Sequence, residues 1–360
     1  MRLGLSRRSP KIRVAVAVVV LAGIGVGVYL GFPAARAKRL ARDPSAAAPV
    51  KTASHAGGPT CPLSGTPAPG GQVLQRSAIA VKVDNYPAGR PQSGLTHADI
   101  VFEEPVEGGI TRFVAVFQCQ EASLVGPIRS ARAVDAGMLD ELSDPIFVHV
   151  GGIQPVLQLI NAANATNVDL RFDPPTPTHL SGRYAPYDTY VSTQSVWSHY
   201  NRGASAPSPI FTYSSAAPAG TPVGTVHIPF SSTNDNTWTW DAHSGQWMLS
   251  IGGRQATVLD GNPIGVANVV VMTVNVTYGP WVEDSHGGLE VQFNPLAGGA
   301  LQVLRNGVAI SGQWERSSLS TPTRLLAADG SQISLAPGET WVEIVPSAIP
   351  VTTTPPGAGS

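Results

Sequence analysis

A run of twenty uncharged residues at positions 14–33 constrains this chain more than any other feature of its sequence. A helix needs roughly 20 apolar residues to cross a bilayer, so the run is long enough to span one. Residues 1–13 carry five basic residues and no acidic residue, a pattern that keeps the N-terminus in the cytoplasm. We therefore predict a cytoplasmic basic leader at 1–13, a transmembrane anchor at 14–33 and an extracytoplasmic remainder.

A cleaved signal peptide is the alternative interpretation of this segment. Ala35-Arg36-Ala37 matches the A-x-A pattern of a cleavage site, and cleavage would release the protein as a secreted one. The basic residues that follow the apolar run at 36–42 favour the anchor, which makes the protein single-pass in the cell membrane. In both cases we expect residues 34–60, rich in Ala and Pro, to form a flexible tether.

The extracytoplasmic part of the chain is acidic. Nine of the 23 Lys and Arg residues lie in residues 1–42, which leaves 14 basic against 24 acidic residues and a formal charge of −10 for residues 43–360. Such a balance offers no broad basic surface to a phosphate backbone, so it excludes nucleic acid as a partner. The sequence has no H-E-x-x-H motif, no clustered Cys and His and no G-x-S-x-G motif, so it predicts no metal, no cofactor and no serine hydrolase.

Alternating segments predict a mixed α/β domain over residues 61–203. Short apolar runs favour strands, and the segments between several of them favour helices, an order typical of α/β layers. The expected strands lie at 78–83, 100–102, 111–118 and 146–150, and the expected helices at 130–142, 154–163 and 192–200.

The second half of the chain is predicted to be β-rich, which makes the whole an α+β protein. Gly and Pro together supply 70 of 360 residues, as in turn-rich β structure. Residues 204–224 have the Pro-, Ala- and Ser-rich composition of a linker, residues 225–346 form the β-rich domain, and Asn306-Gly307 predicts a hairpin inside it. We expect residues 347–360 to be a disordered tail.

The chain has two cysteines, Cys61 and Cys119. An even pair in an exported protein predicts one disulfide. That bond would tie the first residues of the folded region to the end of the third expected strand. The alternative is two free buried thiols.

Charged residues gather between positions 84 and 132, at expected strand ends and helix starts. Arg129 and Arg132 lie three residues apart, so they share one face of the expected helix near its free N–H groups. This arrangement predicts an anion site for a phosphate, a carboxylate or an acidic wall sugar. The alternative is that both arginines pair internally with nearby acids. The candidate ligand-binding residues are Asp84, Asn85, Arg90, Glu103, Arg129, Arg132 and His149.

Catalysis by carboxylates in the same stretch is a second hypothesis. Glu103 with Glu107 resembles the paired acids of a glycan hydrolase, and either Glu103 or Asp84 would serve as acid or base. Pro105 and Gly108-Gly109 imply a turn, so the sequence does not give the separation of the two glutamates. His149 ends an expected strand before Gly-Gly. This position is compatible with a functional histidine and with a hydrogen-bonded structural one.

Long motifs across residues 61–346 resemble the YerB-like family of bacterial lipoproteins, a two-part domain of unknown function. The chain departs from the expected pattern at Tyr187-Asp188, where a His-Asn pair is typical, and it lacks a lipobox cysteine. The motifs are CPLSG at 61, VKVDNYPAGRPQSGL at 81, ADIVFEEPVEGGITRF at 98, GPIRSAR at 126, VHVGG at 148, RYAPYDTYVS at 183, HIPFS at 227, PTRLLAADG at 322 and PGETWVEIVP at 337.

The resemblance implies an α/β part followed by a β-rich part on the outer face of the membrane, and it implies no activity. Together with the charge pattern, it predicts an envelope-facing binding or scaffold module for an anionic wall component or another envelope protein. The alternative function is a hydrolase or transferase that acts on cell-wall glycan or peptide.

Overall fold

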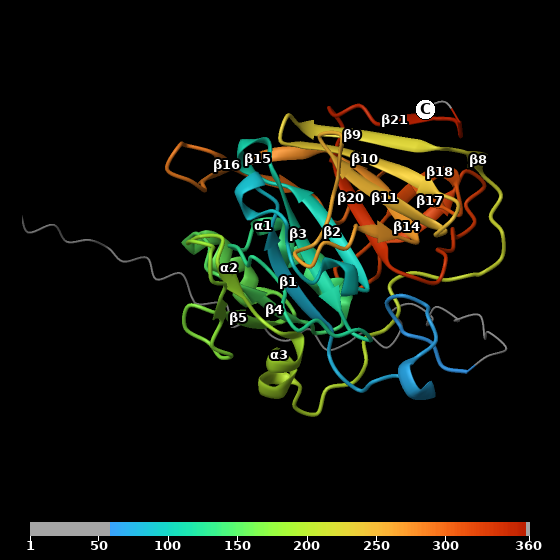
Figure 1. Ribbon diagram of the computed structural model, residues 1–360. Helices are drawn as coiled ribbons and strands as arrows, with labels where there is room; N and C mark the ends of the chain where they lie inside the picture. Colours follow the sequence, from blue (N-terminus) through green and yellow to red (C-terminus); the bar gives the residue numbers. More distant parts are fainter. Residues whose placement is uncertain (1–57, 358–360) are drawn as a thin grey trace, which may run out of the picture. The chain divides into compact units, whose positions relative to one another are not determined.

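The computed structural model describes residues 58–357, and Figure 1 shows their arrangement. The basic leader at 1–13, the apolar run at 14–33 and nearly all of the expected tether at 34–60 lie outside the described residues. Within residues 58–357 no helix is both long and apolar enough to cross a membrane.

One mixed sheet of eleven strands runs through both halves of the chain. Its order is β19-β18-β17-β14-β20-β2-β3-β1-β4-β5, and β8 pairs with β18 beside this path. The strands are β1 (Ile79–Asp84), β2 (Ile100–Pro105), β3 (Thr111–Phe117), β4 (Ile146–His149), β5 (Thr166–Asp169), β8 (Thr221–Pro222), β14 (Asn268–Val274), β17 (Gly298–Arg305), β18 (Val308–Glu315), β19 (Arg324–Ala327) and β20 (Thr340–Pro346).

The two halves meet where β2 pairs in parallel with β20. Ile100 lies opposite Thr340, and the register continues to Glu103 opposite Glu343. Strands outnumber helices in the described chain as a whole, and the first half is less clearly α/β than the sequence predicted. The two-part order, with a β-rich second half, agrees with the prediction.

Two helices cover one face of the central sheet, and the second sheet with a third helix covers the other face. Side chains alternate across a strand, and both faces of this sheet are apolar. Val81 and Val83 of β1 belong to the core shared with the second sheet and α3, whereas Ala80 belongs to the core beneath α1 and α2. The helices are α1 (Ala133–Leu139), α2 (Gln154–Ala162) and α3 (Thr193–Tyr200), with 3-10 turns at Pro69–Gly71, Pro87–Gly89, Leu95–His97, Glu107–Gly109 and Asp140–Leu142.

The second sheet has six strands and lies beside β14, β17 and β20 in Figure 1. A separate ribbon, β15–β16, projects from the same half of the chain, and β6–β7 form a short pair. The bounds are β9 (Thr225–Ser231), β10 (Asn234–Asp241), β11 (Gln246–Ile251), β12 (Arg254–Gln255), β13 (Gly265–Val266), β15 (Val276–Val282), β16 (Leu289–Phe293), β21 (Thr352–Thr354), β6 (Thr178–His179) and β7 (Thr189–Tyr190).

The C-terminal tail corrects the prediction of disorder. Residues Thr352–Thr354 form β21, which pairs antiparallel with β9. Threonine favours extended structure, and the free edge of β9 supplies backbone partners for it. The composition of a short terminal segment does not reveal such a partner.

Two local predictions are confirmed. Cys61 and Cys119 form a disulfide across a sequence separation of 58. β17 and β18 form a hairpin across Asn306-Gly307, where both residues have positive φ, 51° and 74°. That conformation is the one that a two-residue turn of this sequence favours.

Candidate functional site

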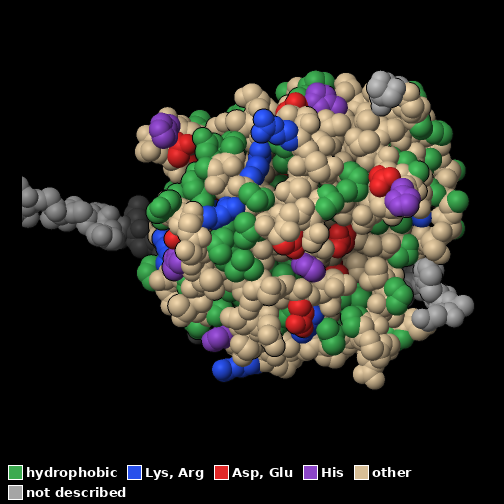
Figure 2. Space-filling model, in the orientation of Figure 1, with side chains coloured by type: hydrophobic (Ala, Val, Ile, Leu, Met, Phe, Trp, Pro, Cys, Tyr) green, Lys and Arg blue, Asp and Glu red, His purple; other side chains and the backbone are tan. Residues whose placement is uncertain are grey.

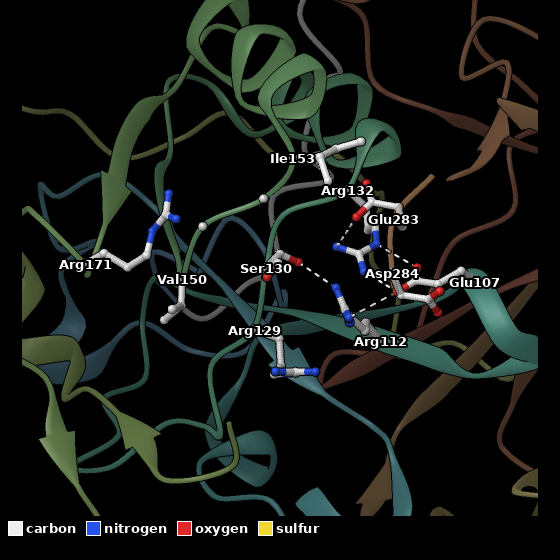
Figure 3. Close-up of a pocket in the computed structure, with 12 residues that line it drawn as sticks. Glu107, Arg112, Arg129, Ser130, Arg132, Val150, Ile153, Arg171, Glu283 and Asp284 are labelled. Carbon is white, nitrogen blue, oxygen red and sulfur yellow. Dashed lines mark hydrogen bonds and ion pairs between the residues drawn. The ribbon is translucent and has the colours of Figure 1, made fainter. Parts of the chain in front are cut away.

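A cavity of about 310 Å³ opens beside the carboxyl ends of β1 and β4 (Figure 3). Four arginines line it together with three carboxylates, and residues from both halves of the chain contribute. The lining residues are Glu107, Arg112, Arg129, Ser130, Arg132, Val150, Gly151, Gly152, Ile153, Arg171, Glu283 and Asp284.

The backbone explains why this edge of the sheet carries the site. β1 and β4 are parallel, so both end at the same edge, where ligand sites form in α/β sheets. The segment that contains Arg129 passes between them, because Arg129 N–H donates to the Lys82 carbonyl and Val150 N–H donates to the Arg129 carbonyl. Gly151 and Gly152 then lead from β4 to the start of α2, which no side chain caps.

Arg132 is held by carboxylates from both halves of the chain. Its guanidinium donates two hydrogen bonds to Glu107, one of them from Nε at 2.8 Å, and lies 3.3 Å from Glu283 of the β15–β16 ribbon. Glu290 of the same ribbon accepts a bond of 2.6 Å from the backbone N–H of Ala133. The C-terminal half thus completes one wall of a cavity that begins in the N-terminal half.

The pKa values in this wall follow from burial and charge. Burial alone would raise the pKa of Glu107, but hydrogen bonds and charges from Arg132 and Arg112 lower it to about 2. Burial, with a hydrogen bond to Glu283, raises the pKa of Glu290 to about 8. At neutral pH Glu107 is therefore ionised and Glu290 is largely protonated.

Arg129 and Arg171 occupy the other side of the cavity (Figure 3). Nε of Arg129 lies 3.5 Å from Asp84, a contact at the limit of an ion pair, and 23% of the Arg129 side chain is exposed. The ring of Tyr187 lies 5.6 Å from its guanidinium. Arg171 forms a forked pair with Asp169, at 2.6 Å for its closest contact.

A second buried charge cluster contacts the segment that carries Arg132. Lys82 is fully buried, binds Glu104, and donates to Asp135 at 2.7 Å. The other oxygen of Asp135 accepts from the backbone N–H of Arg132 at 2.7 Å, which fixes the start of α1. Burial is the main reason that the pKa of Lys82 falls to about 8.

Three of the candidate ligand residues lie away from the cavity. Asn85 and Arg90 bind each other, at 2.9 Å between Arg90 Nε and Asn85 Oδ1, and Asn85 donates to Glu103. Glu103 also accepts from Asn236 of the second sheet at 3.0 Å. These side chains connect the two sheets and do not line the cavity.

Glu103 faces Glu343, and both are fully buried. Burial raises the pKa of each carboxyl, and the neighbouring acid raises that of Glu343 further. Trp341 donates to Glu103 at 3.1 Å and Trp238 donates to Glu343 at 2.7 Å. The two acids are thus stabilised by neutral donors, and burial beside each other favours their protonated forms.

Asp84 and His149 lie close to the cavity but are buried. Asp84 has no exposed surface and contacts Nε of Arg129 from the protein interior. His149 is hydrogen-bonded at both ring nitrogens, at 2.8 Å to the Gly151 carbonyl and at 2.7 Å to Asn167 Oδ1. The geometry of His149 is that of a structural histidine beneath the glycine turn.

Of the predicted ligand residues, Arg129 and Arg132 line the cavity, whereas four of its charged residues, Arg112, Arg171, Glu283 and Asp284, were not predicted to belong to a site. Arg171 follows the short edge strand β5, and Glu283 and Asp284 come from a ribbon more than 150 positions later in the chain. No local pattern links them to residues 129–132. The one local signal in the sequence was the glycine pair at 151–152, directly after a strand. It indicates the turn that lines the cavity together with these residues.

Charge is sparse elsewhere on the protein. On the face drawn in Figure 2 the basic side chains lie in a few small groups among neutral and apolar surface. Only 13% of all residues are Asp, Glu, Lys or Arg. Among residues 58–357 no group of three or more His, Cys, Asp or Glu is arranged to hold a metal ion. The four cavity arginines are therefore a local concentration, and their chemistry suits an anion.

Comparison with known families defines the class of protein. Residues 63–205 match the N-terminal domain, and residues 226–342 the C-terminal domain, of the family described as protein of unknown function (DUF3048). The protein from Bacillus subtilis strain 168 called "Putative lipoprotein YerB" is 30% identical over 289 residues, which cover 76% of this chain and 83% of that protein. This chain belongs to the YerB family, as its motifs predicted.

A solved structure agrees with this assignment. The crystal structure of the YerB protein from Bacillus subtilis has a TM-score of 0.69 and 25% sequence identity to this chain. The match covers 82% of this chain and 99% of that structure. The shared fold therefore includes both halves and the sheet that joins them.

Proposed function

We propose that this protein is an envelope-facing binding module that holds an anionic group of a wall component or of another envelope protein. The basic leader and the apolar run support a membrane anchor with the folded part outside the cytoplasm. The lipoprotein name of the YerB relative supports the same location. The cavity beside β1 and β4 is the proposed binding site.

The observation that carries the proposal is the state of Arg129. Within residues 58–357 its two terminal nitrogens donate no hydrogen bond, and its only ion pair is the 3.5 Å contact through Nε. A guanidinium with free donors beside an uncapped helix start is suited to a carboxylate or a phosphate. Arg171 adds a second positive charge on the same side of the cavity.

The volume of the cavity limits what it holds. A volume near 310 Å³ corresponds to about ten water molecules at roughly 30 Å³ each, so it accommodates one sugar or one or two amino-acid residues. The cavity therefore lies at the small end of ligand pockets, whose volumes begin at about 300 Å³. We therefore propose that the site binds one unit or one end of a larger molecule.

No observation favours the hydrolase alternative with Asp84 or Glu103 as acid or base. Both side chains are fully buried, and Glu103 lies between the two sheets, away from the cavity. A polymer would have to displace the second sheet to reach it. Incubation of the full-length protein with purified wall fragments distinguishes the two functions, because a binding module retains fragments and releases no new ends.

The direct test of the binding site is Arg129→Ala. We expect full-length Arg129→Ala, purified in detergent, to lose retention of wall fragments on a column while its melting temperature stays within about 2 °C, because the side chain is partly exposed. Arg324→Ala is the matched control, since Arg324 is an exposed arginine paired with Glu315 far from the cavity. A loss of roughly 3 kcal/mol or more with retention intact would identify Arg129 as a structural residue and contradict the proposal.

A further inference from the structure

The cavity is not uniformly basic: its charges are separated. Figure 3 places Arg171 to the left of Ser130, Arg129 below it, and Glu107, Glu283 and Asp284 to the right. Arg129 and Arg171 thus lie apart from the three carboxylates, whereas Arg112 and Arg132 lie with the carboxylates and pair with them. A ligand that carries negative charge alone would meet attraction on one side and repulsion on the other.

The carboxylates differ in what already binds them. Glu107 and Glu283 both pair with Arg132, and Glu107 also contacts Arg112 at 3.5 Å. Asp284 has no ion pair with any residue in the described range 58–357. It is the carboxylate of the cavity that remains available to a cation.

The loop between β15 and β16 holds Asp284 in place. Its Oδ1 accepts from the backbone N–H of His286 at 2.8 Å and of Gly288 at 2.9 Å. Oδ2 accepts no hydrogen bond from the described part of the chain. Asp284 is therefore fixed by one oxygen, and the other is free for a ligand.

Arg129 is, like Asp284, only partly engaged by other residues, but it carries a positive charge. Its Nε is engaged only by the long contact to Asp84, and its terminal nitrogens are free within residues 58–357. Arg112, which is 4% exposed and lines the cavity, also has an Nε without a partner in that range. The cavity thus presents unused donors at Arg129 and Arg112 and an unused acceptor at Asp284.

We propose that the ligand of this cavity is a zwitterion of one or two residues, with its carboxylate or phosphate at Arg129 and Arg171 and its ammonium group at Asp284. This inference rests on the proposed function and specifies its ligand. Complementary charges at both ends fix the orientation of a bound group and exclude molecules that have only one of them. An amino-acid or peptide end, or an amino alcohol phosphate, has the required chemistry.

The test compares zwitterionic probes with probes that carry the same kind of anion but lack the ammonium group. Titration calorimetry on the full-length protein in detergent would use alanylalanine against N-acetyl-alanylalanine, and phosphoethanolamine against inorganic phosphate. We expect at least one zwitterion to bind about fivefold more tightly than its partner without an ammonium group, the factor that a partly exposed ion pair of about 1 kcal/mol supplies. The pair that shows the preference identifies a carboxylate or a phosphate as the anionic end.

Asp284→Asn assigns the preference to one side chain. Asparagine keeps the oxygen that accepts from His286 and Gly288, so the loop remains intact, and we expect the preference to fall to about one while the binding of the N-acetylated or inorganic anion is kept. Asp241→Asn is the matched control, because Asp241 accepts from the backbone N–H of His243 at 3.0 Å in a similar turn elsewhere. It should leave the preference unchanged.

Three results would overturn the inference. The first is equal or tighter binding of the probes that lack an ammonium group, and the second is an unchanged preference in Asp284→Asn. In both cases a loss of anion binding in Arg129→Ala would still support the proposed function. The third is no binding of any probe or of wall fragments, which would overturn the proposed function and the inference together.

Discussion

Glu103 and Glu104 are neighbours on β2, are equally buried, and lie in opposite chemical surroundings. Glu103 points towards the second sheet and shares its surroundings with another acid, Glu343. Glu104 points towards α1 and binds Lys82. The two side chains have different surroundings because successive side chains of a strand point to opposite faces of the sheet.

The difference shows two ways to bury a carboxylate. On the face of Glu103 the tryptophan and asparagine donors are neutral, and burial favours the protonated acid. On the face of Glu104 cations are available, and a chain of ion pairs continues from Lys82 through Asp135 to the start of α1 and the cavity. The charged face is the one that forms the proposed site, and the neutral face joins the sheets.

The largest expected effect comes from breaking the charged face. We expect Lys82→Met to lower the free energy of unfolding by about 3–5 kcal/mol, because Glu104 and Asp135 would remain buried without a cation. Urea denaturation followed by tryptophan fluorescence measures the change. Arg324→Ala, which breaks the exposed pair with Glu315, should cost about 1 kcal/mol or less. Equal losses in the two variants would show that burial of Lys82 has no energetic role.

A smaller and pH-dependent effect is expected at Glu107. Its pKa is lowered to about 2 in the folded protein, so its contribution is present above the unfolded pKa of about 4.3 and is lost as the pH falls towards 2. The corresponding free energy is about 3 kcal/mol. Glu107→Gln should therefore be less stable than the natural protein at pH 7, and the difference should narrow between pH 4 and pH 2. A constant difference across that range would contradict the ion-pair explanation.

The smallest effect, with the opposite sign, is expected at Glu343. Its pKa is raised by burial and by Glu103, so the stability that it supplies is complete below the unfolded pKa and is lost as the pH rises towards the folded pKa. Glutamine remains neutral and keeps a donor for Glu103. We expect Glu343→Gln to change stability by about 1 kcal/mol or less near pH 4 and to gain on the natural protein as the pH rises. A gain in the opposite direction would show that Glu343 is ionised in the fold.

Local sequence patterns predicted the parts of the molecule that depend on neighbours in the chain. The helix face predicted for Arg129 and Arg132 was wrong, because α1 begins only at Ala133, after both arginines. The hairpin at Asn306-Gly307 and the disulfide follow from short-range rules and from the even pair of cysteines. The different fates of Glu103 and Glu104 do not, although alternation alone requires them to face opposite sides. What lies on each side is set by distant segments, as in the bond from Trp341 to Glu103 across 238 residues.

The same long-range dependence explains what was missed in the cavity. Glu283 and Asp284 reach it only because the β15–β16 ribbon extends from the C-terminal half and contacts α1. A short acidic turn followed by Gly287-Gly288 is a common surface pattern. Its role depends on the pairing of β2 with β20, which places the two halves side by side.

That pairing also governs how the protein can be assembled. The chain is synthesised from its N-terminus, so β2 forms with β3 while its other edge has no partner until β20 arrives near the end. β14, the second neighbour of β20, also has an unpaired edge until β20 is synthesised. Bare edges recruit strands from other chains, and contacts between distant segments form slowly. Loss of the last twenty-one residues, from Thr340 onwards, would remove β20 and leave the edges of β2 and β14 unpaired at once, which would favour pairing with strands of other chains.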